Sequence, residues 1–423
     1  NYIEIADKIY NKKQIFFIGR AIDYAIALEA SLKLKEISYI NSVAYQAGEL
    51  KHGTISLIAK NTPVIALLTD EEIAEKTISN IKETKARGAY VILVTNMIPN
   101  EKFYDKIITI DKIEEMLKPY GYNFQRTNKG CAVITIPGES NERVVGLSAH
   151  VDTLGAMVRS ITGSGTLRFT LLGGPIVPTL DGEYCTIRTR EGKLYTGTFL
   201  STSPAAHVFK DASTKKRDDE NMEVRIDEVV KSKEDVEKLG IAPGDFIFID
   251  PKTTITESGF IKSRFIDDKG SVSALIAMIE MFKREDITPK YTTKILISTY
   301  EEVGHGAAYI PEDITEMISV DMGCIGEDLS CSEYDVSICA KDSSGPYDYN
   351  MVTELVNLAK KNELSYAVDI YPMYGSDVSA ALRGGNDIRG ALIGPGVHAS
   401  HGMERTHVSA LENTIKLLTA YLV

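Results

Sequence analysis

The chain has 423 residues, of which 43% are apolar and 25% are charged, and this length favours two or three domains. A net charge of −12 argues against a general nucleic-acid binder, which needs a basic face, and against binding to anionic membranes. No apolar stretch approaches the roughly 20 residues of a membrane span. The five cysteines form no CxxC pair and indicate reduced thiols in a cytoplasmic protein. The chain does not begin with Met, so we expect an incomplete amino terminus.

The first 110 residues alternate between apolar runs typical of buried strands and segments with helical spacing. The predicted strands and helices, in chain order, are strand Gln14–Gly19, helix Ala21–Ile40, strand Thr62–Thr69, helix Glu71–Arg87, strand Tyr90–Asn96 and a short strand Lys106–Ile110. This alternation predicts a parallel sheet covered by helices.

The pattern changes twice after residue 110. A helix (Lys112–Tyr120) and two strands (Gly130–Pro137 and Val144–His150) come first, and residues 166–257 then carry short β-prone runs separated by turns. Alternation returns with helix Gly270–Arg284, strands Thr293–Thr299 and Met317–Asp321, and helices Tyr349–Lys361 and Ser409–Leu422. We therefore predict an α/β catalytic domain (111–165 and 258–423) interrupted by a small, β-rich, barrel-like domain (166–257).

Five short features after residue 140 place His or carboxylate side chains at or near the end of an apolar run. They are His150-Val151-Asp152, Ile266-Asp267-Asp268, Glu301-Glu302-Val303-Gly304, Val320-Asp321-Met322-Gly323 and His398-Ala399-Ser400-His401. Open α/β sheets build their sites at the carboxyl ends of strands. Each feature alone also fits a solvated surface, and Asp267-Asp268 also fits a helix N-cap, but five in succession favour a single site.

A dinuclear metal centre explains these residue types. Two divalent ions about 3.5–4 Å apart need a bridging carboxylate, further His or carboxylate ligands, and a carboxylate that takes a proton from water. Adjacent Glu301 and Glu302 can divide the roles of base and ligand. In His150-Val151-Asp152, the Asp152 carboxylate can accept the second ring N–H of the His150 ligand.

The order of these features resembles the M42 family of metallo-aminopeptidases over roughly residues 120–423. Leu147–Asp152 (LSAHVD), residues 263–269 (SRFIDDK) and Gly375-Ser376-Asp377 belong to the same resemblance. It implies a zinc-peptidase-type fold, peptide substrates and two divalent ions, with zinc favoured and cobalt or manganese also suitable. The metal ligands it implies are His150, Asp267, Glu302, Asp321 and a late His, with Asp267 bridging the two ions. Glu301 would be the general base, and Asp152 would orient His150 without binding metal.

The long interval from His150 to Asp267 accommodates the β-rich insert and supports the M42 family over other dinuclear zinc peptidases. The family's late His precedes a Glu by a few residues, so His401, followed by Glu404, is favoured and His398 is second. His407 lies too close to the closing helix. In the peptidase context, His52, His207 and His305 are interpreted as structural or exposed. Members of the family form hollow tetrahedral dodecamers through the inserted domain, which predicts a homo-oligomer here, subject to interference from the first 110 residues.

The first 110 residues resemble the second sugar-isomerase (SIS) half of the glucosamine-6-phosphate synthase isomerase domain, most clearly over residues 28–53. The resemblance assigns sugar binding, proton transfer and ring opening to Lys33, Glu36 and His52. The phosphate-binding first half and the glutaminase domain of that family have no counterpart in this sequence. This predicts a vestigial fragment in a chain that is chimeric, engineered or mis-assembled. The alternative function is therefore a sugar-phosphate-binding isomerase remnant joined to an inert peptidase scaffold, and a third hypothesis is a protein that only assembles.

Overall fold

The computed structural model describes residues 2–69, 73–95, 102–109, 113, 117, 120–326 and 328–423. The chain divides into two compact units, Asn1–Pro119 and Tyr120–Val423. Among the described residues, no helix is long and apolar enough to cross a membrane. The helix predicted over Lys112–Tyr120 lies mostly outside the described residues.

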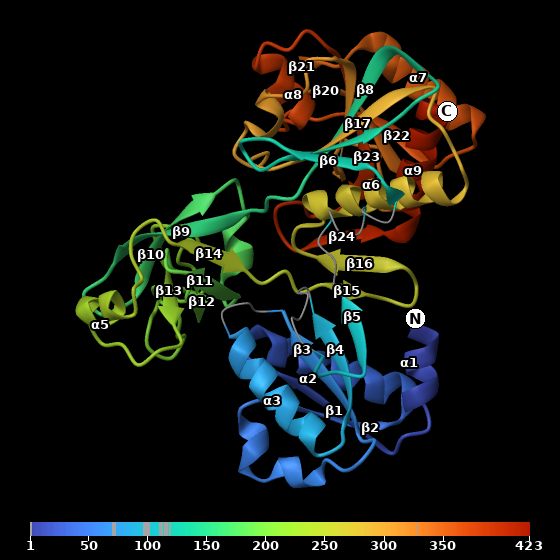
Figure 1. The fold of residues 1–423 in the computed structure, drawn as a ribbon. Coiled ribbons are helices and arrows are strands. Elements are labelled where there is room, and N and C mark those ends of the chain that lie inside the picture. Colours follow the sequence, from blue (N-terminus) through green and yellow to red (C-terminus); the bar gives the residue numbers. More distant parts are fainter. Residues whose placement is uncertain are drawn as a thin grey trace. The chain divides into compact units, whose positions relative to one another are not determined.

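The first unit contains a parallel sheet in the order β2-β1-β3-β4-β5 (Figure 1). Its strands are β1 (Gln14–Gly19), β2 (Asn41–Gln46), β3 (Pro63–Leu68), β4 (Tyr90–Thr95) and β5 (Lys106–Thr109). Its described helices are α1 (Tyr2–Ile9), α2 (Ile22–Ser38) and α3 (Ala74–Ala86), with the 3-10 turns η1 (Glu49–His52) and η2 (Thr54–Leu57). Successive side chains of β1 enter two different cores, Phe16 with Ile81 of α3 and Phe17 with Ala27 of α2, so helices cover both faces. The predicted parallel α/β unit is confirmed, although the edge strand β2 was not predicted.

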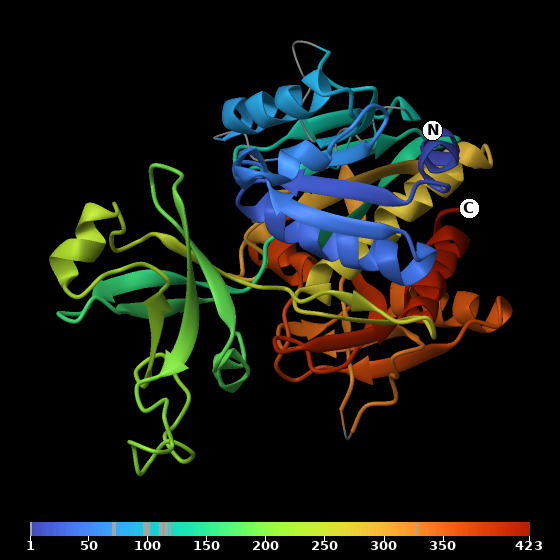
Figure 2. The same cartoon turned by 90° about the horizontal axis from the view of Figure 1, so that it is seen from below.

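A closed six-stranded barrel lies within the second unit, in the order β10-β13-β12-β11-β14-β9 (Figure 2). Its elements are β9 (Gly155–Ile161), β10 (Leu167–Leu172), η4 (Val177–Leu180), β11 (Tyr184–Arg188), β12 (Leu194–Ser201), β13 (Met222–Ile226), α5 (Lys233–Lys238) and β14 (Phe246–Ile249). Side chains fill the barrel, as in other small barrels, and Phe169 and Phe199 meet edge to face at 5.1 Å in its core. The β-rich, barrel-like character predicted for this region is thus confirmed.

The predicted domain boundaries remain predictions. The barrel itself begins with β9 at Gly155, ahead of the predicted boundary at residue 166. Strand β9 pairs with both β10 and β14, so the barrel cannot close without it.

The remainder of the second unit is built on a ten-stranded mixed sheet (Figure 1). Its strands are β6 (Asn123–Arg126), β7 (Ala132–Ile136), β8 (Ser140–His150), β17 (Tyr291–Ser298), β18 (Ile314–Val320), β19 (Gly323–Cys324), β20 (Val336–Asp342), β21 (Gly345–Pro346), β22 (Tyr366–Ile370) and β23 (Arg389–Val397). The accompanying helices are α6 (Ile266–Arg284), η5 (Gly306–Ala308), α7 (Tyr349–Lys361), α8 (Asp377–Arg383) and α9 (Val408–Leu422). A separate three-stranded sheet joins β15 (Thr254–Ile255), β16 (Phe260–Ser263) and β24 (Glu404–His407).

Four neighbouring strands at the centre of the large sheet, β23, β18, β8 and β17, are parallel. Their middles are buried and apolar, as Leu147, Ile295 and Ile318 illustrate. Because the strands are parallel, all four carboxyl ends reach the same edge of the sheet. Strand β8 ends at His150, Asp321 follows β18 directly, Glu301 and Glu302 follow β17, and His401 follows β23.

Candidate metal centre

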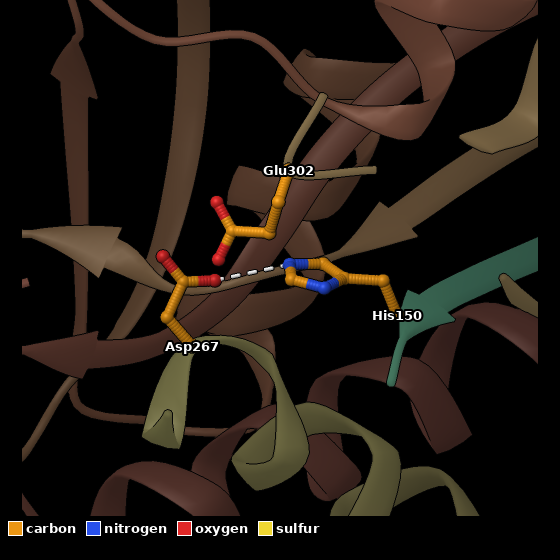
Figure 3. Close-up of side chains that lie close together, drawn as sticks. All are labelled: His150, Asp267 and Glu302. Carbon is orange, nitrogen blue, oxygen red and sulfur yellow. Dashed lines mark hydrogen bonds and ion pairs between the residues drawn. The ribbon is translucent and has the colours of Figure 1, made fainter. Parts of the chain in front are cut away.

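His150, Asp267 and Glu302 meet at the carboxyl edge of the sheet (Figure 3). His150 is 1% exposed, and its Nε2 lies 3.1 Å from Oδ1 of Asp267, which stands in the first turn of α6. One donor atom from each of the three side chains lies within 4.8 Å of the others. Such a cluster of imidazole and carboxylate donors is suited to a divalent metal ion.

A second cluster adds Asp268 and Asp321 to the same histidine. Asp268 is fully buried; its Oδ2 accepts a hydrogen bond from the backbone N–H of His150 at 3.1 Å, whereas its Oδ1 has no hydrogen-bond partner among the described residues. Sequence reasoning did not assign Asp268 to the metal site. The signal was present in the Asp267-Asp268 pair, but a carboxylate at the start of a helix is also a common N-cap.

His401 approaches the first cluster from the opposite side of Asp267. Its Nε2 lies 3.6 Å from Oδ2 of Asp267 and 3.8 Å from Oε2 of Glu302. The two oxygens of Asp267 thus face different histidines, which is the arrangement that a bridging carboxylate requires. His398, the second choice, forms a backbone β-bridge with Arg405. The assignment of His401 as a ligand stays a prediction, supported by this geometry.

Asp152 contacts both His150 and the loop that carries the paired glutamates. Its backbone carbonyl accepts a hydrogen bond from Nδ1 of His150 at 3.0 Å, whereas its carboxylate Oδ1 lies 3.6 Å from the same nitrogen. The carboxylate oxygens accept the backbone N–H groups of Glu301 and Glu302, each at 3.1 Å. Asp152 therefore orients the ring largely through its main chain and uses its side chain to hold the glutamate loop.

Glu301 lies beside the histidine that the two clusters share, with its Oε2 at 3.7 Å from Nε2 of His150. The loop leaves little space here, since a Cβ added to Gly306 would lie 2.5 Å from Oδ1 of Asp377 and 3.1 Å from the Glu301 backbone. Asp377, which is 1% exposed, accepts hydrogen bonds from Ser298 Oγ and the Ala307 backbone N–H. The loop is therefore packed against α8 and anchored at both ends.

The site concentrates negative charge in a poorly hydrated place. Burial, followed by repulsion from Asp267, raises the pKa of Glu302 to about 9. The same two causes raise the pKa of Asp321 to about 7. Burial and the Asp321 carboxylate hold the pKa values of Glu301 and Asp268 well above their usual range. Buried charges of one sign are costly unless something neutralises them, and a divalent cation does so.

The donor atoms fit such an ion. Glu302 Oε1 and Asp268 Oδ1 are buried and lack a hydrogen-bond partner among the described residues, although buried carboxylate oxygens are normally satisfied. The set contains histidine nitrogen and carboxylate oxygen, which suits zinc, cobalt or manganese. A cavity of about 220 Å³ opens onto the cluster and is lined in part by Glu301, Tyr374 and Arg383.

The raised pKa values predict how the stability of the metal-free protein depends on pH. A carboxyl group whose pKa is higher in the folded than in the unfolded chain keeps a proton that unfolding releases, so stability falls as pH rises from the unfolded value, about 4, through the folded value. For Asp321 and Glu302 the folded values are about 7 and about 9. We expect the melting temperature of the chelated protein to fall between about pH 5 and about pH 8. Scanning calorimetry on Glu302→Gln should show a shallower decline; a flat or rising wild-type profile would contradict the assignment.

The isomerase-like residues are described only in part. Lys33 lies on α2 with its exposed ammonium 3.7 Å from the Glu29 carboxylate. The side chains of Glu36 and His52 lie outside the described residues. His207 and His305 are exposed, as predicted, and the His305 ring stacks on Tyr300 at 5.1 Å.

Comparisons with known proteins divide the chain in the same way. The family model for M42 glutamyl aminopeptidase matches residues 130–417, and the SIS domain model matches residues 8–116. The putative aminopeptidase YhfE of Bacillus subtilis is 47% identical over 348 residues, which cover 82% of this chain and 97% of that protein. The glutamine–fructose-6-phosphate aminotransferase of Caldanaerobacter subterraneus is 47% identical over 141 residues, or 31% of this chain, but this chain spans only 23% of that enzyme.

Solved structures share the fold of the second unit. The TET aminopeptidase of a marine sediment Thaumarchaeota archaeon superimposes with a TM-score of 0.67 at 19% identity, covering 73% of this chain and 88% of that one. The TET1 peptidase of Pyrococcus horikoshii gives a TM-score of 0.63 at 23% identity, covering 73% and 92%. Fold, family model and relative together define a peptidase of the hydrolase class. The chain belongs to the M42 glutamyl aminopeptidase family.

Proposed function

We propose that this protein is a dinuclear-metal aminopeptidase that removes amino-terminal residues from peptides. The observation that supports this most directly is the position of Asp267, whose two carboxylate oxygens face His150 at 3.1 Å and His401 at 3.6 Å. His150 and Asp321 would hold one ion, Glu302 and His401 the other, and Asp267 would be shared. When bound, such a pair of ions polarises the peptide carbonyl and makes water nucleophilic at neutral pH.

Glu301 is proposed as the general base. Its carboxylate lines the cavity, and burial together with the Asp321 charge raises its pKa well above the ordinary value. A carboxyl group with a raised pKa can accept a proton from the attacking water and return it to the leaving amine near neutral pH. The backbone N–H of Glu301, held by the Asp152 carboxylate, fixes the start of this side chain.

The charge of the cavity suggests how a peptide is oriented. Several carboxylates line the cavity, which favours a positively charged amino terminus, and Arg383 adds a positive charge to the same lining. The Arg383 guanidinium donates to Ser344 Oγ at 2.7 Å and is otherwise exposed. Because the family description names glutamyl aminopeptidases, we propose that acidic amino-terminal residues are preferred, with Arg383 facing their carboxylates.

We further propose a cytoplasmic homo-oligomer. The matching TET1 peptidase of Pyrococcus horikoshii is described as assembling into a tetrahedron or a large octahedral shell, and the barrel of this chain carries exposed apolar side chains on β14, Phe246 and Phe248. Such exposed aromatic residues commonly mark interfaces. Sedimentation velocity on the full chain would distinguish a large assembly from a monomer.

The isomerase remnant remains the alternative, because the first unit is similar to one part of glutamine–fructose-6-phosphate aminotransferases. That alternative requires the full chain to bind a hexose phosphate through Glu36 and His52. The absence of any binding heat in calorimetry with glucosamine-6-phosphate would eliminate it.

The experiment that tests the proposed function combines metal analysis with a substrate panel. Protein purified without chelator should contain about two divalent ions per chain by mass spectrometry, as a dinuclear site requires. It should also release chromophore from aminoacyl anilides, fastest from glutamyl or aspartyl anilide. In Arg383→Ala, turnover of acidic anilides should fall while neutral anilides remain close to wild type. If protein purified without chelator contained no divalent metal and released no chromophore, the aminopeptidase would be refuted. Equal losses of turnover on all anilides in Arg383→Ala would refute only the role of Arg383.

A further inference from the structure

Glu404 is a buried carboxylate that none of the roles above includes. It begins β24, is 1% exposed, and contacts Asp267, which lies 137 positions away in the sequence. Its Oε2 accepts the backbone N–H of Asp267 at 3.0 Å, and its Oε1 accepts the backbone N–H of His401 at 3.0 Å. One carboxylate therefore connects the main chains of two proposed ligands.

Both segments need such support, because their backbones leave regular structure at the site. His401 has φ 63°, in the left-handed region that residues with a Cβ rarely adopt, and the same is true of Phe265, two residues before Asp267, at φ 65°. Local conformations of this kind persist only where the surroundings determine them strongly. Hydrogen bonds to Glu404 supply part of that determination, at His401 itself and at Asp267, two residues after Phe265.

The barrel holds the other side of the His401 loop. The carbonyl of Gly174 accepts from His401 Nδ1 at 2.9 Å, which leaves Nε2 to face Asp267 and Glu302. The Ile176 N–H donates to the His401 carbonyl at 2.9 Å. The loop is thus held by main-chain contacts from the barrel, by the Glu404 side chain from β24, and by the Arg264 guanidinium, which donates to the Gly402 carbonyl at 3.4 Å.

Glu404 is better suited to positioning than to ligation. Each of its oxygens already accepts a backbone N–H, and a carboxylate that binds a metal directly would give up at least one of these bonds. Groups that hold metal ligands in place affect metal affinity although they do not touch the ion.

We propose that Glu404 is a positioning residue that sets the separation of Asp267 and His401 and thereby forms the ion site that these two residues share. This inference rests on the proposed dinuclear function. The two hydrogen bonds of Glu404 form a clamp between Asp267 and His401. The other ion, near His150 and Asp321, depends only on the bond to Asp267. Loss of Glu404 should therefore lower the affinity for the two ions by different factors.

The test is a titration of the metal-free full chain with Co²⁺, followed by visible absorption and calorimetry. Wild type should bind two ions in two resolvable steps. The step that is lost in His401→Ala is the binding of the ion held by Asp267 and His401. In Glu404→Gln, whose amide nitrogen cannot accept an N–H, that same step should weaken by about 10- to 100-fold while the other changes much less. Glu333→Gln is the matched control, since Glu333 accepts from Arg405 Nε at 2.8 Å in β24 without contacting the cluster.

The outcomes separate the two proposals. If wild type binds two Co²⁺ ions and Glu404→Gln binds them with unchanged affinity, or if both steps weaken equally, the positioning role is wrong while the dinuclear site stands. An equal effect in Glu333→Gln would also overturn it. If wild type binds no ions, the proposed function itself fails. Should Glu404→Gln not fold, Glu404→Asp, which keeps both acceptors on a side chain one methylene shorter, should still weaken the His401 step, and wild-type affinity there would overturn the inference.

Discussion

Glu301→Gln is expected to lower kcat by about 10²- to 10⁴-fold while the protein keeps its metal, because the amide cannot accept the proton that the attacking water loses. The substitution preserves the size of the side chain and leaves the backbone N–H in its bond to Asp152. Turnover of a glutamyl anilide, with the metal content of the same sample, measures both effects.

The matched control is Glu312→Gln, a substitution of an exposed glutamate on the second unit that should leave turnover unchanged. Activity within a factor of about ten of wild type in Glu301→Gln, below the range typical of general base catalysis, would mean that another group takes the proton. Loss of metal together with activity would instead indicate that Glu301 is a ligand.

Asp267→Asn is expected to affect both ions, because a single carboxylate faces His150 through Oδ1 and His401 through Oδ2. An asparagine offers only one acceptor oxygen and no charge, so it cannot bridge. Metal ions contribute several kcal/mol of transition-state stabilisation, so turnover should fall by roughly 10³-fold or more. Mass spectrometry should show fewer than two bound ions at metal concentrations that saturate wild type.

Asp313→Asn serves as the control, since Asp313 forms an exposed ion pair with Lys294. It should retain both ions and full turnover. Two retained ions in Asp267→Asn would contradict the bridging role. The same samples also test chelation: a chelator should abolish wild-type turnover, and added Zn²⁺ or Co²⁺ should restore it.

Much of the fold followed from local patterns. The apolar runs that became β1, β3, β4, β8 and β17 are short and bounded by turn residues, and the helical spacing of α7 and α9 is regular, so their type was predictable. Strand β2 was missed because its side chains are mostly only partly buried, which gives little hydrophobic signal. Helix α8 was missed because it is short and begins with Ser376-Asp377, residues equally typical of a turn.

The candidate site likewise contains residues that were predicted from the sequence and residues that were missed. The short features that carry His150, Asp267, Glu302, Asp321 and His401 stood out because each lies at or near the end of an apolar run. The resemblance to the M42 family then implied these five residues as ligands, and the structure brings them together at one sheet edge. Asp268 and the clamp formed by Glu404 were not predicted as parts of the site. Their roles depend on which backbone N–H groups they reach. Asp268 binds the N–H of a residue 118 positions away in the sequence, and Glu404 binds one 137 positions away.

The sequence by itself determined the class of chemistry, the order of the acidic and histidine residues, and the two-part organisation of the chain. These features depend on side-chain type and on the spacing of apolar residues, both of which can be read without knowing any tertiary contact. Only the tertiary structure decided that β9 belongs to the barrel, that Asp152 holds the glutamate loop, and that barrel and β24 together fix His401. Hydrogen bonds and charge repulsion act over a few ångströms in space, so they are settled only when packing brings remote segments together.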